Sequence, residues 1–569
     1  MTSPLCTCSF GAMRKAAILF LAIVPMVVSC KKSETSTTGA AATASGAPAT
    51  AAVATGAVSS ATIAAPDTVA LWIKVSNIRA AWKGFAHYAH ADESSPDQAF
   101  SQLFQGEALK LLKLDGPLAL ALPVEGMNSP SPVFALDVGD YSAAKNAFKT
   151  TQDGEKLHVN GILTSAGGPG VICDLVNDAG AGRLLCGKPA DIDAAGAFAS
   201  KTLMSLHTDA MVTLELLPQH ARGMLKMAPL MLGSTVRDPV QSAQVGKLID
   251  MLLDTRALRA SLTPDAAALS MGWRMDVDAA SGELSKRLGA AALATGAAPA
   301  EFDALSADSV VALGSVRTAE DAEDSAATKS ALAQLGLPAE LVGTLLQAAD
   351  GPGKVISYTL RVSTPLGEPV AVVSSTLDEA RDLRKDTELG KKAAAAIKGK
   401  PYSVSPIGAW AGSSLPSNAL RMLVKIKSSA KAPSSFTLAS VYDGARMVTF
   451  ASSSTKSIDA AYTELKAPAT TRLGDNTFVQ AARKGGAKQV GAVRIDSLVE
   501  MVLANKAGWT KAVAQLREQQ AESVAPLTWA SYTSGPNTGA KAFSLWGDIS
   551  VPGNAIDAVF SAAKDKEVW

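Results

Sequence analysis

The chain has 569 residues, of which 47% are hydrophobic and 18% charged, and its 53 Lys and Arg nearly balance its 52 Asp and Glu. This composition lies within the range of globular proteins and excludes a disordered or fibrous chain. The neutral balance gives no electrostatic reason to expect a nucleic acid partner, and the length is enough for two or more domains.

The first thirty residues have the pattern of an export signal. Arg14 and Lys15 precede an apolar run over 16–28, which is shorter than the roughly 20 apolar residues that cross a bilayer as a helix. The run ends in Val27-Val28-Ser29-Cys30 rather than in an A-x-A-type cleavage site. The sequence therefore predicts a signal peptide over 1–29, with Met13 as an alternative start of translation.

The end of this run resembles the lipobox of bacterial lipoproteins. In that family the cysteine thiol receives a diacylglyceryl group, and a peptidase cuts just before the cysteine. The resemblance implies that Cys30 is lipidated and that the mature protein is held on a membrane of the bacterial envelope by acyl chains. Lys31 follows Cys30, and the absence of Asp there favours the outer over the inner membrane if enterobacterial sorting rules apply. The alternative is an ordinary cysteine after an ordinary signal peptide.

Residues 33–65 consist almost entirely of Ala, Thr, Ser and Gly. Such a segment has no large apolar side chains to bury, so we expect the lipidated cysteine to be followed by a flexible tether over 30–65. A partly helical Ala-rich stalk is the alternative. No later run reaches 18 uninterrupted apolar residues, so we expect an anchored protein and no second membrane crossing.

The body from Pro66 onward contains six pairs of similar segments in the same order. The pairs are 67–75 with 308–316, 115–117 with 350–352, 132–136 with 369–373, 183–195 with 446–461, 211–225 with 490–503, and 269–277 with 543–551. Six ordered pairs predict two related halves, 66–300 and 301–569, although chance similarity is the alternative. The style of this body resembles uncharacterised bacterial envelope lipoproteins, which implies location more than activity.

Each half mixes strand-like and helical segments with hairpin signals, which favours an α+β fold with a largely antiparallel sheet and helices packed on one face. Apolar residues at helical spacing predict long helices over 241–260 and 325–349. Alternation from Leu269 to Val277 predicts a strand whose odd-numbered side chains point inward.

Two cysteines beyond the lipobox lie on the arms of a predicted hairpin, 171–176 and 183–187, with 177–182 as its loop. In this register Cys173 lies directly opposite Cys186, close enough for a disulfide. An oxidising envelope favours the bonded state, and two buried free thiols are the alternative.

The sequence offers little that points to catalysis. His87 and His90 stand at a spacing that places them on one helix face, but no H-E-x-x-H pattern occurs, and a solvated helix end is the favoured interpretation. Two S-x-x-K strings, 428–431 and 453–456, lack the S-D-N and K-T-G partners of penicillin-recognising enzymes. We therefore expect no catalytic residues, no metal site and no cofactor.

Three methionines in the apolar stretch 219–232, Met224, Met227 and Met231, could line a binding groove, although methionine also fills ordinary cores. The first hypothesis for function is a non-catalytic binding or scaffolding lipoprotein, with an envelope protein as its partner. The alternatives are a carrier or sensor of an apolar ligand and a hydrolase of unrecognised type.

Overall fold

The computed structural model divides the chain into two compact units, Met1–Leu284 and Ser285–Trp569. The residues that the structure describes are 64–88, 95–105, 107–124, 131–153, 156–163, 170–223, 225–226, 249–250, 252–265, 268–278, 296–316, 355–380, 388, 402–426, 434–467, 469–503, 525–534 and 542–554. The expected tether lies outside these residues except at its last two positions.

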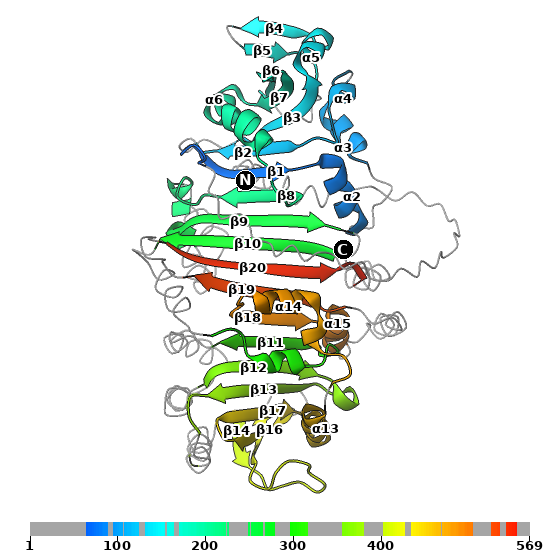
Figure 1. Cartoon of the computed structure of the whole chain (residues 1–569), viewed down its shortest axis with the longest axis vertical. Helices are drawn as coiled ribbons and strands as arrows, with labels where there is room; N and C mark the ends of the chain where they lie inside the picture. The colour runs from blue at the N-terminus through cyan, green and yellow to red at the C-terminus, as the bar shows by residue number, and fades with distance from the viewer. Residues whose placement is uncertain are drawn as a thin grey trace, which may run out of the picture. The chain divides into compact units, whose positions relative to one another are not determined.

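The described part of the first unit contains ten strands. They are β1 (Val69–Val75), β2 (Leu118–Pro123), β3 (Val133–Asp140), β4 (Thr150–Asp153), β5 (Lys156–Val159), β6 (Ile172–Asp178), β7 (Ala181–Gly187), β8 (Val212–Leu216), β9 (Thr255–Pro264) and β10 (Ala268–Asp278). Their order across the sheet is β4-β5-β6-β7-β3-β2-β1-β8-β9-β10, and every neighbouring pair is antiparallel (Figure 1).

Helices pack on both faces of this sheet. They are α2 (Ile78–Tyr88), α3 (Pro96–Leu103), α4 (Glu107–Leu111), α5 (Tyr141–Ala147), α6 (Pro189–Ala197) and the π-helix η2 (Phe198–Leu203). Leu184 belongs to the core under α2 to α5, whereas the next residue, Leu185, belongs to the core under α6 and η2. Successive residues of a strand point to opposite faces. The expectation of helices on one face is therefore wrong for this unit.

The described part of the second unit also contains ten strands. They are β11 (Val311–Val316), β12 (Val355–Ser363), β13 (Val370–Leu377), β14 (Tyr402–Pro406), β15 (Leu420–Ile426), β16 (Ser434–Asp443), β17 (Arg446–Ser452), β18 (Gln489–Val493), β19 (Leu527–Ser534) and β20 (Ala542–Pro552). Their order is β14-β15-β16-β17-β13-β12-β11-β18-β19-β20, and every neighbouring pair is again antiparallel.

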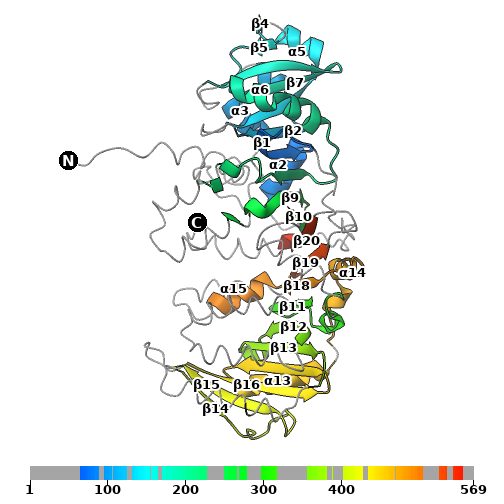
Figure 2. The ribbon, with the colours of Figure 1, turned by 90° about the vertical axis from the view of Figure 1, so that its left-hand side faces the viewer.

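The second unit also has helices on both sides of its sheet. They are η3 (Ala300–Ala304), η5 (Pro365–Gly367), α13 (Thr455–Lys466), η6 (Leu473–Asp475), α14 (Thr477–Lys484) and α15 (Ile495–Leu503). Ile458 of α13 packs with Val372 and Phe450, and Figure 2 shows α14 and α15 on opposite sides of the strands. Both units are thus mainly antiparallel sheet with helices packed against it, as expected for an α+β fold.

Residues 252–254 are helical, but β9 begins at Thr255, so the predicted helix over 241–260 is wrong from that residue onward. The apolar residues that suggested the helix all precede Thr255. From there, Arg259 faces Glu215 across the β8 ladder, and Leu258 points to the other face. The predicted helix over 325–349 and residues 241–248 lie outside the described residues.

Strand β10 occupies the expected segment, but its odd-numbered residues are not all buried. Met271, Trp273 and Met275 are only partly buried, whereas the intervening Asp276 is buried. The reason is an ionic contact: Asp276 accepts a hydrogen bond from Arg274 and forms an ion pair with Arg259 on the same face, as described below.

The contacts of residues 298 and 299 indicate that the second unit begins before the expected boundary at 300/301. Ala298 donates its N–H to the Ala487 carbonyl, and Arg483 donates to the carbonyls of Ala298 and Pro299. This segment therefore packs on the second unit, whose boundary lies earlier, at Ser285. No helix among the described residues has both the length and the apolar character needed to span a bilayer.

Gly491 provides a test of the second sheet. A Cβ at this position would lie 2.0 Å from the ring of Trp529, its partner on β19. We expect Gly491→Ala to destabilise the second unit by about 1–3 kcal/mol, because the indole must move out of its packed position. Denaturant unfolding measures this loss.

The matched control is Gly408→Ala, since a Cβ there would meet no atom within 4 Å. We expect its unfolding midpoint to equal that of the wild type. Equal midpoints for both variants would contradict the packing of Trp529 on Gly491.

Candidate functional site

The predicted disulfide is present in the first unit. Cys173 of β6 and Cys186 of β7 are bonded, and they are directly opposite in the ladder with Cα atoms 4.1 Å apart. The connecting turn is shorter than expected, because β6 and β7 continue to Asp178 and Ala181. The turn residues Ala179 and Gly180 both have positive φ, which suits a two-residue hairpin.

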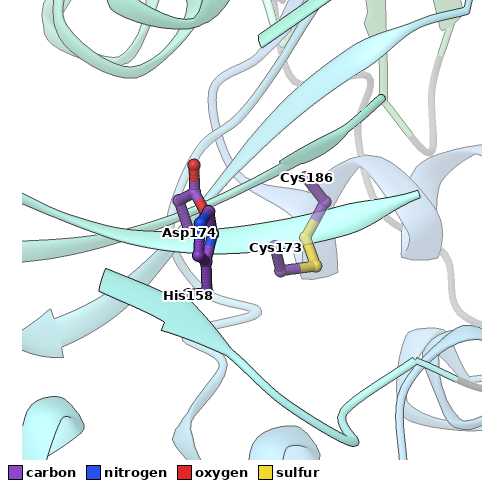
Figure 3. The surroundings of a disulfide bond; sticks show 4 residues. All are labelled: His158, Cys173, Asp174 and Cys186. Atoms are coloured by element: carbon purple, nitrogen blue, oxygen red, sulfur yellow. A yellow bond between two sulfur atoms is a disulfide. The ribbon is translucent and has the colours of Figure 1, made fainter. Parts of the chain in front are cut away.

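A histidine and a carboxylate lie next to this disulfide (Figure 3). His158 of β5 is opposite Asp174 of β6, and its Nδ1 contacts the Asp174 carboxylate. Asp174 follows Cys173, so the pair and the disulfide are on opposite faces of the sheet. The Asp174 side chain is 5% exposed, and the His158 side chain is 26% exposed. The carboxylate is therefore shielded from water, whereas water can reach the imidazole that contacts it.

A larger group of buried charges crosses β1, β8, β9 and β10. Glu215 accepts hydrogen bonds from Trp72 Nε1 at 2.8 Å and from Arg259 Nε at 2.6 Å. Asp276 contacts Arg259 at 3.4 Å and accepts from Arg274 Nε at 2.9 Å. Glu215 is completely buried, and a buried charge is tolerated only when it is paired in this way. The group fixes the register of the four strands.

Lys74 is another buried charge in the first unit. Its Nζ donates to the carbonyl of Met204 at 3.1 Å and to that of Leu206, just beyond the end of η2. A lysine at this place satisfies carbonyl groups that a helix end leaves without partners. Burial, together with the positive charge of Arg183, lowers the pKa of Lys74 to about 8.

Asp459 of α13 organises a loop in the second unit. Its Oδ2 accepts from Trp410 Nε1 at 2.5 Å, and its Oδ1 accepts from Ser414 N at 2.8 Å and from the hydroxyls of Ser413 and Ser414. Arg421 lies over the Trp410 ring, 5.3 Å from its centre. These contacts bind the loop 407–419 to the helix.

The S-x-x-K string at 453–456 marks the start of α13. Ser454 is the N-cap residue, and its hydroxyl accepts from Ser457 N. The Ser453 hydroxyl is 3.5 Å from the Glu368 carboxylate. In this arrangement the serines begin a helix and contact a carboxylate, and the other string, 428–431, lies outside the described residues.

The remaining predicted site residues are mostly outside the part of the chain that the structure describes. This holds for the lipidation candidate Cys30, for the apolar candidates Met224, Met227 and Met231, and for His90. His87 is in the last turn of α2. Within the described ranges, no three His, Cys, Asp or Glu side chains are grouped closely enough to hold a metal ion.

Sequence reasoning missed the buried charges of β1, β8, β9 and β10 and the contacts of Asp459. Their members are far apart in the chain, and charged residues are usually exposed, so only the strand register could have brought them together. The polar groups described above connect strands, helix ends and loops to one another, so they hold elements of the fold together.

Reduction of the disulfide tests its contribution. We expect it to lower the free energy of unfolding by about 3 kcal/mol, the value for a loop closed over a separation of 13 residues. Denaturant unfolding with and without a reductant measures the change. The double variant Cys173→Ala, Cys186→Ala should show no response to reductant, and a wild type that also shows none would contradict this role.

The buried Lys74 predicts a specific pH dependence. Between about pH 8 and the ordinary value of 10.5, the unfolded chain holds a proton at Lys74 that the folded protein lacks. The free energy of unfolding should therefore rise with pH across this window, by up to about 3 kcal/mol. Unfolding curves of the wild type minus those of Lys74→Met isolate the contribution, and a flat difference would refute it.

Comparison with known proteins shows no family for this chain. No family model matches it, and no curated protein matches it. Among solved structures, crystal forms IV and I of TP0453 match with TM-scores of 0.22 and 0.21 and sequence identities of 6% and 7%. The matches cover 38% and 40% of this chain and 81% and 84% of those chains. Similarity at this level supports no inference about fold or function.

Proposed function

We propose that this protein is an envelope lipoprotein, anchored through Cys30, with a non-catalytic binding or scaffolding role. The observation that carries the proposal is the disulfide between Cys173 and Cys186, both of which are buried. Structural disulfides form and persist in exported proteins and are rare in the cytosol. The disulfide therefore supports the export that the sequence around Cys30 predicts.

The contacts of the polar side chains support the scaffolding role. Asp459 holds a loop on a helix, Glu215 links three strands, and Lys74 satisfies the end of a helix. Carboxylates and amines committed to such contacts stabilise a rigid surface. A rigid sheet on a tether is suited to presenting that surface to an envelope partner.

The proposal includes two related halves, with the boundary near Ser285 rather than at 301. If ten is added to the number of each strand of the first unit, the spatial order of its strands becomes that of the second unit. The hairpins β6–β7 and β16–β17 both turn over two residues. Counted from these turns, the pair Cys173 and Cys186 corresponds to Leu438 and Ala451, which are also direct partners. This agreement of order and register favours duplication over chance.

The anchor is tested on the full-length chain extracted from membranes with detergent. We expect an intact mass that begins at Cys30 and carries the added mass of acyl chains. The control Cys30→Ala should lose both this mass and its place in the membrane fraction. A wild type that retains residues before Cys30 and carries no acyl mass would overturn the anchor.

The same preparation tests the role of the body. A scaffold predicts no retained small molecule when the noncovalent complex is weighed by native mass spectrometry. A lipid or other apolar molecule that stays bound to the protein at one molecule per chain would contradict the scaffold and support a carrier.

A further inference from the structure

The second unit has an open sheet edge at β14. Among the described strands, β14 pairs only with β15, through five residue pairs without a register shift. Ser403, Ser405 and Pro406 are exposed, and Val404 is partly buried. The outer side of an edge strand carries backbone N–H and C=O groups without ladder partners, and such groups can pair with a strand of another chain.

One hydrogen bond fixes which backbone groups of β14 point outward. Just beyond the strand, the N–H of Ile407 donates to the carbonyl of Arg421 on β15 at 3.0 Å. In an antiparallel pair, successive residues point these groups alternately to the partner strand and away from it. Counted back from Ile407, the groups of Ser405 point to β15, whereas those of Val404 and Tyr402 point outward.

Pro406 fits this alternation. Its nitrogen, which carries no hydrogen, also points outward, so the ladder with β15 loses no donor. The outer side of β14 therefore offers the N–H groups of Tyr402 and Val404 and the carbonyl groups of Tyr402, Val404 and Pro406. A strand that pairs here must supply matching groups at every other residue.

The side chains of β14 do not oppose such pairing. The strand reads Tyr-Ser-Val-Ser-Pro, without a charged residue, and charged side chains are a common means of keeping sheet edges apart. The corresponding edge strand of the first unit, β4, is one residue shorter and ends in Asp153. Val404 lies in a cross-strand row with Val424 and Phe436, both of which are partly buried. An apolar residue on an added strand would extend this row.

The sequence of β14 is suited to pairing with itself. Serines flank Val404 on both sides, so an antiparallel copy centred on Val404 places Val404 opposite itself and Ser403 opposite Ser405. The two Val404 residues then exchange two backbone hydrogen bonds, and the N–H of each Tyr402 donates to the Pro406 carbonyl of the other copy. Facing hydroxyl groups can hydrogen-bond, and no like charges meet. A two-fold symmetric interface requires this kind of self-complementarity.

We propose that β14 pairs with β14 of a second copy of this chain, antiparallel and centred on Val404, to form a two-fold symmetric dimer. All five residues of each strand take part, and the apolar row of Val404, Val424 and Phe436 continues into the second copy. The inference adds a partner to the proposed scaffolding role and does not depend on the lipid anchor, because β14 lies in the body of the chain.

Cysteine cross-linking of the full-length chain in detergent tests the register. Ser403→Cys and Ser405→Cys are purified separately and oxidised either alone or as an equal mixture. In the proposed dimer these positions face each other as a non-hydrogen-bonded pair, whose Cβ atoms are close enough for a disulfide. We expect the mixture to give at least about fivefold more disulfide-linked dimer than either variant alone. The wild type, oxidised in the same way, is the blank.

Val404→Pro tests the hydrogen bonds. The nitrogen of Val404 points away from β15, so this change removes both central hydrogen bonds of the dimer but none within its own sheet. We expect the dissociation constant of the dimer, measured by native mass spectrometry of the detergent-solubilised chain, to rise at least about tenfold. The matched control Val404→Thr keeps the N–H and a β-branched side chain, and it should keep the dimer.

Three results would overturn the dimer: a monomeric wild type, equal dimerisation of Val404→Pro and Val404→Thr, or a cysteine mixture that cross-links no more than the single variants. If Val404→Pro fails to fold, the cysteine mixture decides, because Ser403 and Ser405 are exposed. In native membranes, a disulfide to a different polypeptide in place of the second copy would also contradict the dimer and assign the edge to another protein. A chain without acyl mass at Cys30 would leave these results unchanged, so the anchor and the dimer fail separately.

Discussion

The antiparallel ladder is the constraint on which the rest of this structure depends. In both units, every strand runs opposite to its described neighbours, and the register decides which side chains share a face. A shift of one residue between β6 and β7 would move Cys186 to the face away from Cys173. The same shift between β8 and β9 would separate Glu215 from Arg259. The disulfide and the buried charges therefore all depend on one property of the backbone.

Buried charges in turn make the register specific. Apolar side chains pack adequately in several registers, but an unpaired buried carboxylate or guanidinium costs several kcal/mol. Glu215 and Asp276 each contact Arg259 of the neighbouring strand β9 in the observed register, and a slipped strand would lose both contacts. In the second unit, the buried Asp496 contacts Arg494, two residues before it, at 2.6 Å, and Arg494 also contacts Asp308 at 3.1 Å. The contacts of Arg259 therefore favour a single register for β8, β9 and β10 of the first unit.

Much of the local structure could be predicted from the sequence. The similar segments 183–195 and 446–461 each contain a strand followed by a helix, namely β7 with α6 and β17 with α13, and the segments 132–136 and 369–373 lie at β3 and β13. The disulfide was predictable because a hairpin register is a matter of counting. Strand β9 was missed because the helical spacing of the preceding apolar residues was extended too far. The charges around Glu215 and the loop held by Asp459 were beyond local reasoning, since their partners are as much as 143 residues apart.

The disulfide between Cys173 and Cys186 depends both on export to an oxidising compartment and on the register of β6 and β7. Its presence in cells therefore tests the central claim. Thiols are trapped with an alkylating reagent in intact cells, before lysis, and the purified protein is digested without reduction for peptide mass spectrometry. The account predicts a peptide in which Cys173 is bonded to Cys186. Recovery of both cysteines in alkylated form would contradict the oxidising location and the stabilising role of the bond together.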